Sequence, residues 1–221
     1  MPSWTTCWVT RSATSSADQP AGQARPPRFG AAFPEVLAAA QADAAWAYRR
    51  LFEWLGSPVA GYLRGQGAAD PDGLANDVFL RVFTNLTTFE GSEDGFRSWV
   101  FAIAHNVLID DRRKAGRRPT LAGRPLDDRP WAGSTEGEAL ARLGTERVER
   151  LLEELSPDQR DVLLLRIVAD LTVEQVAYTL GKPAGAVKQL QRRGLAALRR
   201  RLEAGEDGHT LSEASDVHPP R

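Results

Sequence analysis

Residues 172–202 carry the start, stop and restart signals of two helices that are joined by a tight turn. Thr172, with a Gln three positions later, forms a capping box that satisfies two backbone amides at a helix start. Gly181 ends this helix, because glycine accepts the left-handed conformation of a helix stop. Small Ala177 and β-branched Val187 stand at the offsets that a helix-turn-helix requires. The pattern predicts a helix-turn-helix, and an ordinary pair of antiparallel helices is the alternative.

The second of these predicted helices is strongly basic. Residues 183–202 contain six Lys or Arg and no Asp or Glu. With Val187 and Leu190 turned inward, helical spacing turns a polar row outward. Arg, Lys and Gln are the side chains that read base edges in the major groove, so the row favours DNA binding over a merely solvated face. The residues expected to contact DNA are Gly185, Lys188, Gln189, Arg192 and Arg193.

Helical spacing of apolar residues extends over most of the remaining chain. Asp70-Pro71-Asp72 and Ser156-Pro157 are strong helix starts, in which a capping side chain precedes a proline. Residues 91–95 are expected to form a loop. No stretch alternates apolar and polar residues as a half-buried strand does, so the predicted fold class is all-α. The apolar residues recur at helical spacing in residues 36–55, 74–86, 96–108 and 140–155.

Composition divides the chain into two small helical domains and three irregular segments. The first 30 residues are rich in Ser, Thr, Pro, Gly and Ala, which predicts disorder, with an organellar transit peptide as the second interpretation. Prolines and glycines without apolar spacing predict a flexible linker between the domains. The expected order is a disordered extension 1–30, a helical domain 31–118, a linker 119–138, a helix-turn-helix domain 139–203 and an acidic disordered tail 204–221.

Charge, cysteine content and hydropathy exclude several classes of protein. The chain has 28 Lys and Arg against 29 Asp and Glu, a formal net charge of -1, which excludes a strongly basic protein that coats nucleic acid. A single cysteine, Cys7, excludes a disulfide framework and a cysteine-based zinc site. The sequence has neither an apolar run of about 18 residues nor the apolar block of a signal peptide, so a cytoplasmic protein without membrane insertion is expected.

An enzyme is the least favoured class of function. His105 beside Asp110 and Asp111 is the one combination with potential for acid–base chemistry or metal binding, but these spacings do not converge on an amphipathic helix. The sequence has no phosphate-binding glycine loop and no nucleophile motif. We therefore expect no enzymatic activity, no cofactor and no metal site.

A second basic cluster ends the predicted helix that contains Trp99. Its five cations in seven positions exceed what the helix dipole alone would favour, and aromatic residues beside such a strip can stack on unpaired bases. The amide of Asn106 is placed to hydrogen bond the edge of an unstacked base, and the alternative is that it satisfies a backbone group inside the domain. The aromatic residues are Phe89, Phe96, Trp99 and Phe101. The candidates for contact with separated DNA strands are Phe89, Trp99, Asn106, Arg112, Arg113, Lys114, Arg117 and Arg118.

Three stretches of the chain resemble the extracytoplasmic-function (ECF) RNA polymerase sigma factors, the smallest members of the bacterial principal sigma superfamily. They are residues 74–88, 96–114 and 152–202, and the most specific string is Trp-x-x-x-Ile-x-x-Asn-x-x-x-Asp from residue 99 to residue 110. The resemblance implies that the N-terminal domain binds core RNA polymerase and opens the promoter −10 element. It also implies that the C-terminal domain recognises the −35 element and touches the polymerase flap, and that an anti-sigma factor is a further partner.

The resemblance assigns roles to particular residues of the N-terminal domain. Residues 70–94 contain six acids and one cation, which by itself implies a protein partner as well as DNA. Within that range, Asn76 and Asp77 stand where the family usually has Gln-Glu in its polymerase-binding helix, and Asp72 is the third expected contact with core polymerase.

Other matched positions concern promoter DNA. Phe89, the loop at residues 91–95 and Asn106 fall where family members hold a flipped −10 base. Arg112 and Arg113 fall in the strip that faces DNA at the boundary of the melted region. The alternative is another helix-turn-helix regulator that acts without core polymerase. A response regulator of that kind would need parallel strands and an acidic phosphoacceptor pocket, which the N-terminal domain does not show.

Overall fold

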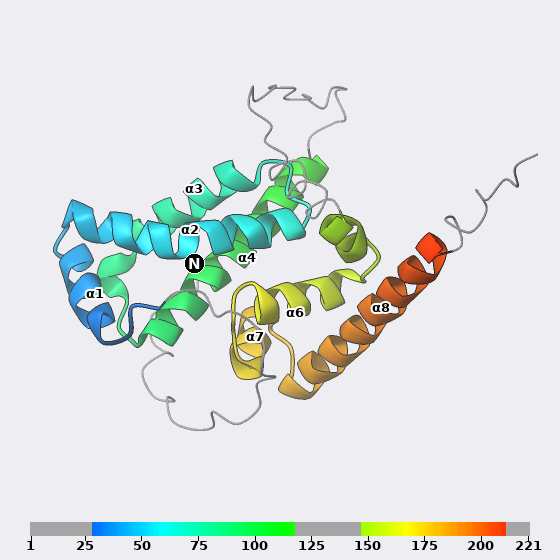
Figure 1. Cartoon of the computed structure of the whole chain (residues 1–221). Helices are drawn as coiled ribbons and strands as arrows, with labels where there is room; N and C mark the ends of the chain where they lie inside the picture. Colours follow the sequence, from blue (N-terminus) through cyan, green and yellow to red (C-terminus); the bar gives the residue numbers. More distant parts are fainter. Residues whose placement is uncertain (1–27, 118–146, 211–221) are drawn as a thin grey trace, which may run out of the picture.

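The computed structural model describes residues 28–117 and 147–210, which form helices and connecting turns without a strand (Figure 1). This confirms the all-α fold class. The segments 1–27, 118–146 and 211–221 lie outside the described residues, and with them Arg118, the predicted linker 119–138 and the start of the helical stretch expected over 140–155. In chain order the helices are η1 (Gly30–Ala32), α1 (Phe33–Gln41), α2 (Ala45–Gly65), α3 (Pro71–Thr84), η2 (Leu86–Thr88), α4 (Glu93–Arg117), α6 (Pro157–Ile167), α7 (Val173–Leu180) and α8 (Ala184–Thr210), and residues 147–153 are also helical.

Side-chain caps start three of these helices where the sequence predicts. The Asp70 carboxylate accepts a hydrogen bond from the amide of Gly73 (2.8 Å) at the start of α3. Ser156 forms a capping box with Gln159 at the start of α6, and Thr172 forms another at the start of α7. Because each cap satisfies amides that no helical carbonyl reaches, residues within three positions decide where these helices begin.

Two helix boundaries differ from the sequence prediction. The apolar spacing of residues 36–55 does not form one helix, because Asp43 adopts a positive φ of 62° and separates α1 from α2. Asp tolerates this left-handed conformation better than most residues, and the turn lets α1 pack back against α2. The loop predicted at residues 91–95 is shorter, because α4 begins at Glu93 and places two acids at the positive end of the helix.

The outer limits of the two domains also differ from the prediction. Arg28 makes side-chain contacts with both domains, so ordered structure begins before residue 31. At the other end α8 continues to Thr210, whereas the sequence predicts an irregular tail from residue 204. Residues 199–204 are mostly good helix formers, which carries the helix past position 203, whereas the low propensities of Gly205, Asp207 and Gly208 do not account for its last turns.

The N-terminal domain is organised around α2, which packs on both α3 and α4 (Figure 1). Apolar residues at helical spacing meet between the three helices, and Leu51, Val78 and Val100 are fully buried there. Aromatic pairs extend this core between α2 and α3, where the ring centres of Phe52 and Phe79 lie 4.8 Å apart. The packing decides which face of α3 and which face of α4 remain available to partners.

The C-terminal domain consists of α6, α7 and α8. Val187 of α8 and Val176 of α7 are both fully buried, as a helix-turn-helix core requires. Gly194 lets α8 approach α6 closely, because a Cβ at that position would lie only 2.8 Å from a methyl carbon of Leu163. The close approach buries one side of α8 and leaves the opposite side exposed.

The two domains pack against each other, which the sequence does not predict. Their buried apolar residues form one continuous core. A Cβ on Gly65 of α2 would lie 2.9 Å from a methyl carbon of Leu164 of α6. Arg97 of α4 donates to the carbonyl of Ala169, which follows α6 (3.3 Å). We refer to this packed state as the closed arrangement.

Candidate nucleic-acid interface

The turn between α7 and α8 has the geometry of a helix-turn-helix. Gly181 ends α7 with a positive φ of 62°, and the amide of Lys182 donates to the carbonyl of Ala177 (2.9 Å). Ala177 is half-buried against the core and Val187 is fully buried. Of the three residues that the sequence singles out, Gly181 therefore ends the first helix, Ala177 is the small residue packed at the core, and Val187 is the buried residue beneath the second helix.

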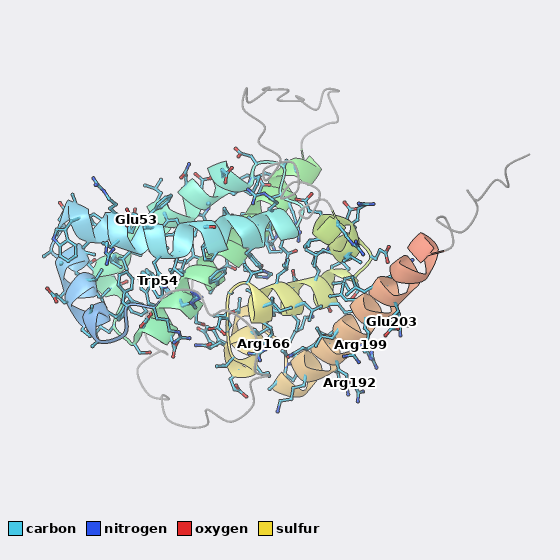
Figure 2. All side chains as sticks on the ribbon, viewed as in Figure 1. Glu53, Trp54, Arg166, Arg192, Arg199 and Glu203 are labelled. Atoms are coloured by element: carbon cyan, nitrogen blue, oxygen red, sulfur yellow. The ribbon has the colours of Figure 1, made fainter. Side chains whose placement is uncertain are left out.

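The exposed side of α8 carries the row of residues expected to contact DNA. Figure 2 shows Arg192 and Arg199 pointing away from α6. Positions three, four and seven apart share one helix face, so the row is continuous. Arg201, outside the row, pairs with Glu154. The exposed members of the row are Gly185, Lys188, Gln189, Arg192 and Arg193.

The aromatic group near the start of α4 is more deeply buried than the sequence predicts. Phe96 and Phe101 are fully buried, and Phe89 is 6% exposed. The ring of Phe89 stacks on Trp99 at 5.1 Å and meets Phe96 edge-on at 5.2 Å. Trp99 is half-buried, and Asn106 is exposed two turns further along α4 on the same side of the helix. The surface available for stacking on a base is therefore the exposed part of Trp99, with Phe89 as its support.

Gln41 at the end of α1 holds the segment that leads to Phe89. Its amide nitrogen donates to the carbonyls of Leu86 (3.1 Å) and Phe89 (2.8 Å). These two bonds tie α1 to the loop before α4. Sequence reasoning missed Gln41, because a glutamine at a helix end carries no pattern that distinguishes a bridging side chain from a solvated one.

The basic strip at the end of α4 divides between structural contacts and exposed charge. Arg112 donates to the backbone carbonyl and the side-chain oxygen of Gln66, at 2.6 and 3.1 Å, and so satisfies the C-terminal end of α2. Arg113 lies 3.9 Å from Asp110. Lys114 is exposed. Arg117 belongs to the last turn of α4, and Arg118 lies beyond the described range.

One face of α3 gathers the three residues expected to contact core polymerase. Asp72, Asn76 and Asp77 are exposed, and Asp72 lies 3.7 Å from Arg64 of α2. Leu80 completes this face with 67% of its surface exposed. An exposed leucine among carboxylates is a common feature of protein interfaces, which combine an apolar centre with a polar rim. Sequence reasoning missed Leu80 because it falls outside the apolar repeat of α3.

His105 lies beside the domain interface and not in an acidic cluster. Its Nδ1 atom is 3.0 Å from the Tyr62 hydroxyl. Burial lowers the pKa of His105, while Asp161 acts to raise it and Arg112 to lower it. Burial raises the pKa of the Tyr62 hydroxyl.

Within residues 28–117 and 147–210, no three His, Cys, Asp or Glu side chains are arranged to hold a metal ion. No helix of these ranges is long and apolar enough to cross a membrane.

Two family models match the chain. Residues 44–118 match the model described as "Sigma-70 region 2", and residues 151–200 match "Sigma-70, region 4". The first match ends with the basic strip of α4, and the second covers the whole helix-turn-helix. The region between the two matches contains the predicted linker.

Curated proteins with similar sequences are ECF RNA polymerase sigma factors. SigD of Mycobacterium tuberculosis strain H37Rv is 31% identical over 180 residues, which cover 78% of this chain and 84% of SigD. BldN of Streptomyces coelicolor is 30% identical over 171 residues, which cover 76% of this chain and 65% of BldN, less than two thirds of that relative. Among solved structures, CnrH in complex with the cytosolic domain of CnrY matches with a TM-score of 0.57 and 25% identity, covering 77% of this chain and 96% of CnrH.

Proposed function

Since this chain belongs to the ECF RNA polymerase sigma factors, we propose that it binds core RNA polymerase and directs transcription initiation at specific promoters. The observation that carries the proposal is the presence of a region 2 domain and a region 4 helix-turn-helix on one chain, with the polar row of α8 exposed. A sigma factor selects the promoter and is not itself an enzyme, so polymerisation belongs to the core polymerase.

The helix-turn-helix is proposed to recognise the −35 element. Lys188 and Gln189 lie on one turn of the exposed side of α8 and Arg192 on the next, and one helix face of this kind enters the major groove. Gly185 leaves room for the DNA backbone, since no atom lies within 4 Å of where its Cβ would be. Arg193 lies beside this row and is proposed to contact phosphate.

The α4 surface is proposed to open the −10 element. The exposed amide of Asn106 can pair with the edge of a flipped base, and the exposed part of Trp99 can stack on it. Phe89 supports Trp99 from below. The adjoining phosphates are proposed to contact the basic strip, which comprises Arg112, Arg113, Lys114, Arg117 and Arg118.

The exposed face of α3 is proposed to bind core polymerase. Asp72, Asn76 and Asp77 supply charge and hydrogen-bonding groups, and Leu80 supplies an apolar anchor that solvent would otherwise surround. Electrostatic complementarity between this acidic face and a basic partner would favour a defined orientation of the complex.

Control by an anti-sigma factor is proposed by analogy with a similar structure. CnrH, to which this chain is similar, was solved in complex with the cytosolic domain of CnrY. We therefore propose a protein inhibitor that binds this chain in the cytoplasm, without insertion of the chain itself into a membrane. Co-purification followed by a reconstituted transcription assay tests it, and an unbound chain under all growth conditions would contradict it.

Transcription with and without core polymerase tests the main proposal. We expect promoter-specific transcripts only when this chain and core polymerase are both present. The chain alone should bind duplex promoter DNA weakly, because its net charge is close to zero and few counterions are released. Tight and specific binding by the chain alone would overturn the proposal in favour of a regulator that acts without core polymerase.

A further inference from the structure

Arg28 connects the two domains through both arms of its guanidinium group. Nη1 lies 2.5 Å from a carboxylate oxygen of Asp94, in the first turn of α4. Nη2 lies 3.1 Å from a carboxylate oxygen of Asp170, between α6 and α7. Arg28 precedes both matched regions, which begin at residues 44 and 151. Neither region match therefore accounts for this bridge.

The two residues after Arg28 anchor it to the N-terminal domain. The amides of Phe29 and Gly30 donate to the two carboxylate oxygens of Glu93, at 3.0 and 2.9 Å. The ring of Phe29 meets Trp54 edge-on at 4.9 Å. Arg28 is therefore held at a defined place on α2 and α4, and its contact with Asp170 adds the C-terminal domain. We call residues 28–30 the clasp.

The contact between the two domains also buries Arg97, a cation whose hydrogen bonds are incomplete. Arg97 is 2% exposed, and its guanidinium lies 5.3 Å from the centre of the Trp54 ring. One arm donates to the Ala169 carbonyl, and the other finds no hydrogen-bond partner among the described residues. Burying a cation with so few bonds opposes closure of the domains. Separation of the domains would return Arg97 to water, so the closed arrangement needs favourable contacts elsewhere, and the clasp supplies some of them.

The closed arrangement is too short to contact both promoter elements at once. From Asn106 to Asp94 the chain runs 12 residues along α4, and from Gln175, which donates to the Asp94 carbonyl, it runs 14 residues to Gln189. At about 1.5 Å per helical residue and at most about 3.6 Å per turn residue, this route measures roughly 60 Å. The −10 and −35 elements lie about 25 base pairs apart, which is about 85 Å of DNA.

We propose that residues 28–30 act as a clasp that holds the two domains closed, and that it must release before the chain can contact both promoter elements. The effect of the clasp on promoter contact rests on the proposed function. The closure of the two domains by the clasp is a property of the free chain. The ion pairs of Arg28 are partly exposed to solvent, so salt should weaken them and favour the open state. A partner that binds only the open state would draw the chain toward it.

Distance measurements between the domains test the clasp directly. Spin labels at Thr87→Cys and Ala196→Cys, both exposed positions, report on one domain each in a Cys7→Ser background. We expect Arg28→Ala and Asp170→Asn each to raise the ratio of open to closed chains about threefold or more at low salt. Asn is chosen because Asp170 has a positive φ of 51°, which Asn tolerates. The matched control is Asp158→Asn, which breaks a partly exposed ion pair with Lys182 inside the C-terminal domain.

Two results would overturn the clasp. One is a distance distribution in Arg28→Ala that equals that of the unsubstituted chain. The other is an Asp170→Asn effect of full size in a chain that already carries Arg28→Ala, because residues that act through one contact cannot contribute twice. Thermal melting of each variant checks that the domains remain folded.

Transcription with limiting amounts of the chain separates the clasp from the proposed function. When only the open state binds, apparent affinity changes in proportion to the open fraction. We expect Arg28→Ala to lower the concentration needed for half-maximal transcription by about the same factor as it raises the open population. If Arg28→Ala opens the chain but leaves transcription unchanged, the clasp does not need to release before the chain contacts both promoter elements, and that part of the proposal is overturned. Failure of every chain to act with core polymerase would instead contradict the proposed function, and the distance measurement would still decide the clasp.

Discussion

At the scale of single residues, the DNA-contacting candidates of α8 contribute little to the folded core. Lys188, Gln189 and Arg192 are exposed, so truncating them opens no cavity. Substitutions of this kind usually change the free energy of unfolding by no more than about 0.5 kcal/mol. Effects of these substitutions on promoter use can therefore be assigned to lost contacts with DNA.

We expect Lys188→Ala, Gln189→Ala and Arg192→Ala to fold normally and to weaken promoter binding by the holoenzyme. A lost base contact should cost about 1–3 kcal/mol and relax preference at one position of the −35 element. A lost phosphate contact should weaken all sequences equally and lower the salt dependence. Binding to a set of −35 variants measures both. Arg201→Ala, outside the row, is the control, and normal activity of all three variants would mean that the face is only solvated.

Asn106→Ala is expected to impair opening of the −10 element without loss of the fold. The side chain is exposed on α4, so its removal should leave the thermal melting temperature nearly unchanged. A promoter with a pre-melted bubble should restore much of the activity, because the cost of unpairing has already been met. Permanganate footprinting on duplex and pre-melted templates measures opening. Normal opening on duplex DNA, or a large loss of stability, would contradict the assigned role.

His105 is expected to make folding sensitive to mild acid. Burial lowers the pKa of His105 below its ordinary value of 6.5, so the unfolded chain takes up a proton first as the pH falls. The contribution of His105 is therefore complete above pH 6.5 and is lost as the pH falls through the range between that value and the lower folded pKa. Urea unfolding at pH 7.5 and pH 5.5 should show a smaller loss of stability for His105→Gln than for the unsubstituted chain. Equal losses would contradict the prediction.

At the scale of helices, α4 serves two purposes along its length. Its first turns contact the C-terminal domain through Asp94 and Arg97, while its last turns carry the basic strip. The close packing of α8 on α6 depends on Gly194, where a side chain would meet Leu163.

Gly194→Ala is expected to destabilise the C-terminal domain. The added Cβ would lie 2.8 Å from a methyl carbon of Leu163, which is 1% exposed and has little room to move. Overpacking of this kind costs about 1–3 kcal/mol, and the better helix propensity of alanine offsets about 0.5–1 kcal/mol of it. Gly185→Ala is the control, because open space surrounds it and only the propensity gain remains. Chemical denaturation measures both, and equal stabilities would contradict the close contact.

At the scale of the whole molecule, the two domains behave as one packed body. Their buried residues form a continuous core, and polar contacts such as that of Gln66 with Asp161 (2.5 Å) surround it. This arrangement leaves the polar row of α8 and the exposed face of α3 uncovered. Closure therefore shortens the span of the molecule and leaves the faces of α3 and α8 that are proposed to bind partners exposed.

Gly65→Ala is expected to shift the chain toward the open state independently of the clasp. A Cβ there would lie 2.9 Å from a methyl carbon of Leu164, which is buried across the domain interface. Overpacking at this contact costs about 1–3 kcal/mol, and separation of the domains relieves it. Small-angle X-ray scattering should report a larger radius of gyration than for Gly56→Ala, whose Cβ would contact only Phe52 of the same helix at 3.4 Å. Equal radii would contradict the prediction.

The helices and the helix-turn-helix follow from the sequence alone because their signals are local. The capping boxes at Ser156 and Thr172 and the stop at Gly181 act within a few residues, so the chain need not be folded for them to be recognised. The exposed row on α8 follows in the same way, since helical spacing turns neighbouring positions to one side. The roles proposed for Asn76 and Asp77 come only from resemblance to a family, because an acidic helix face by itself identifies no partner.

The tertiary structure decided everything that depends on residues far apart in the chain. Arg28 meets Asp94 and Asp170 across 66 and 142 positions, and Arg112 meets Gln66 across 46. Phe89 is buried because α4 and the loop before it fold onto one another, which its place in the sequence does not reveal. Side chains of one type can be solvated or bridging according to what packs beside them, and that choice is made when the core forms.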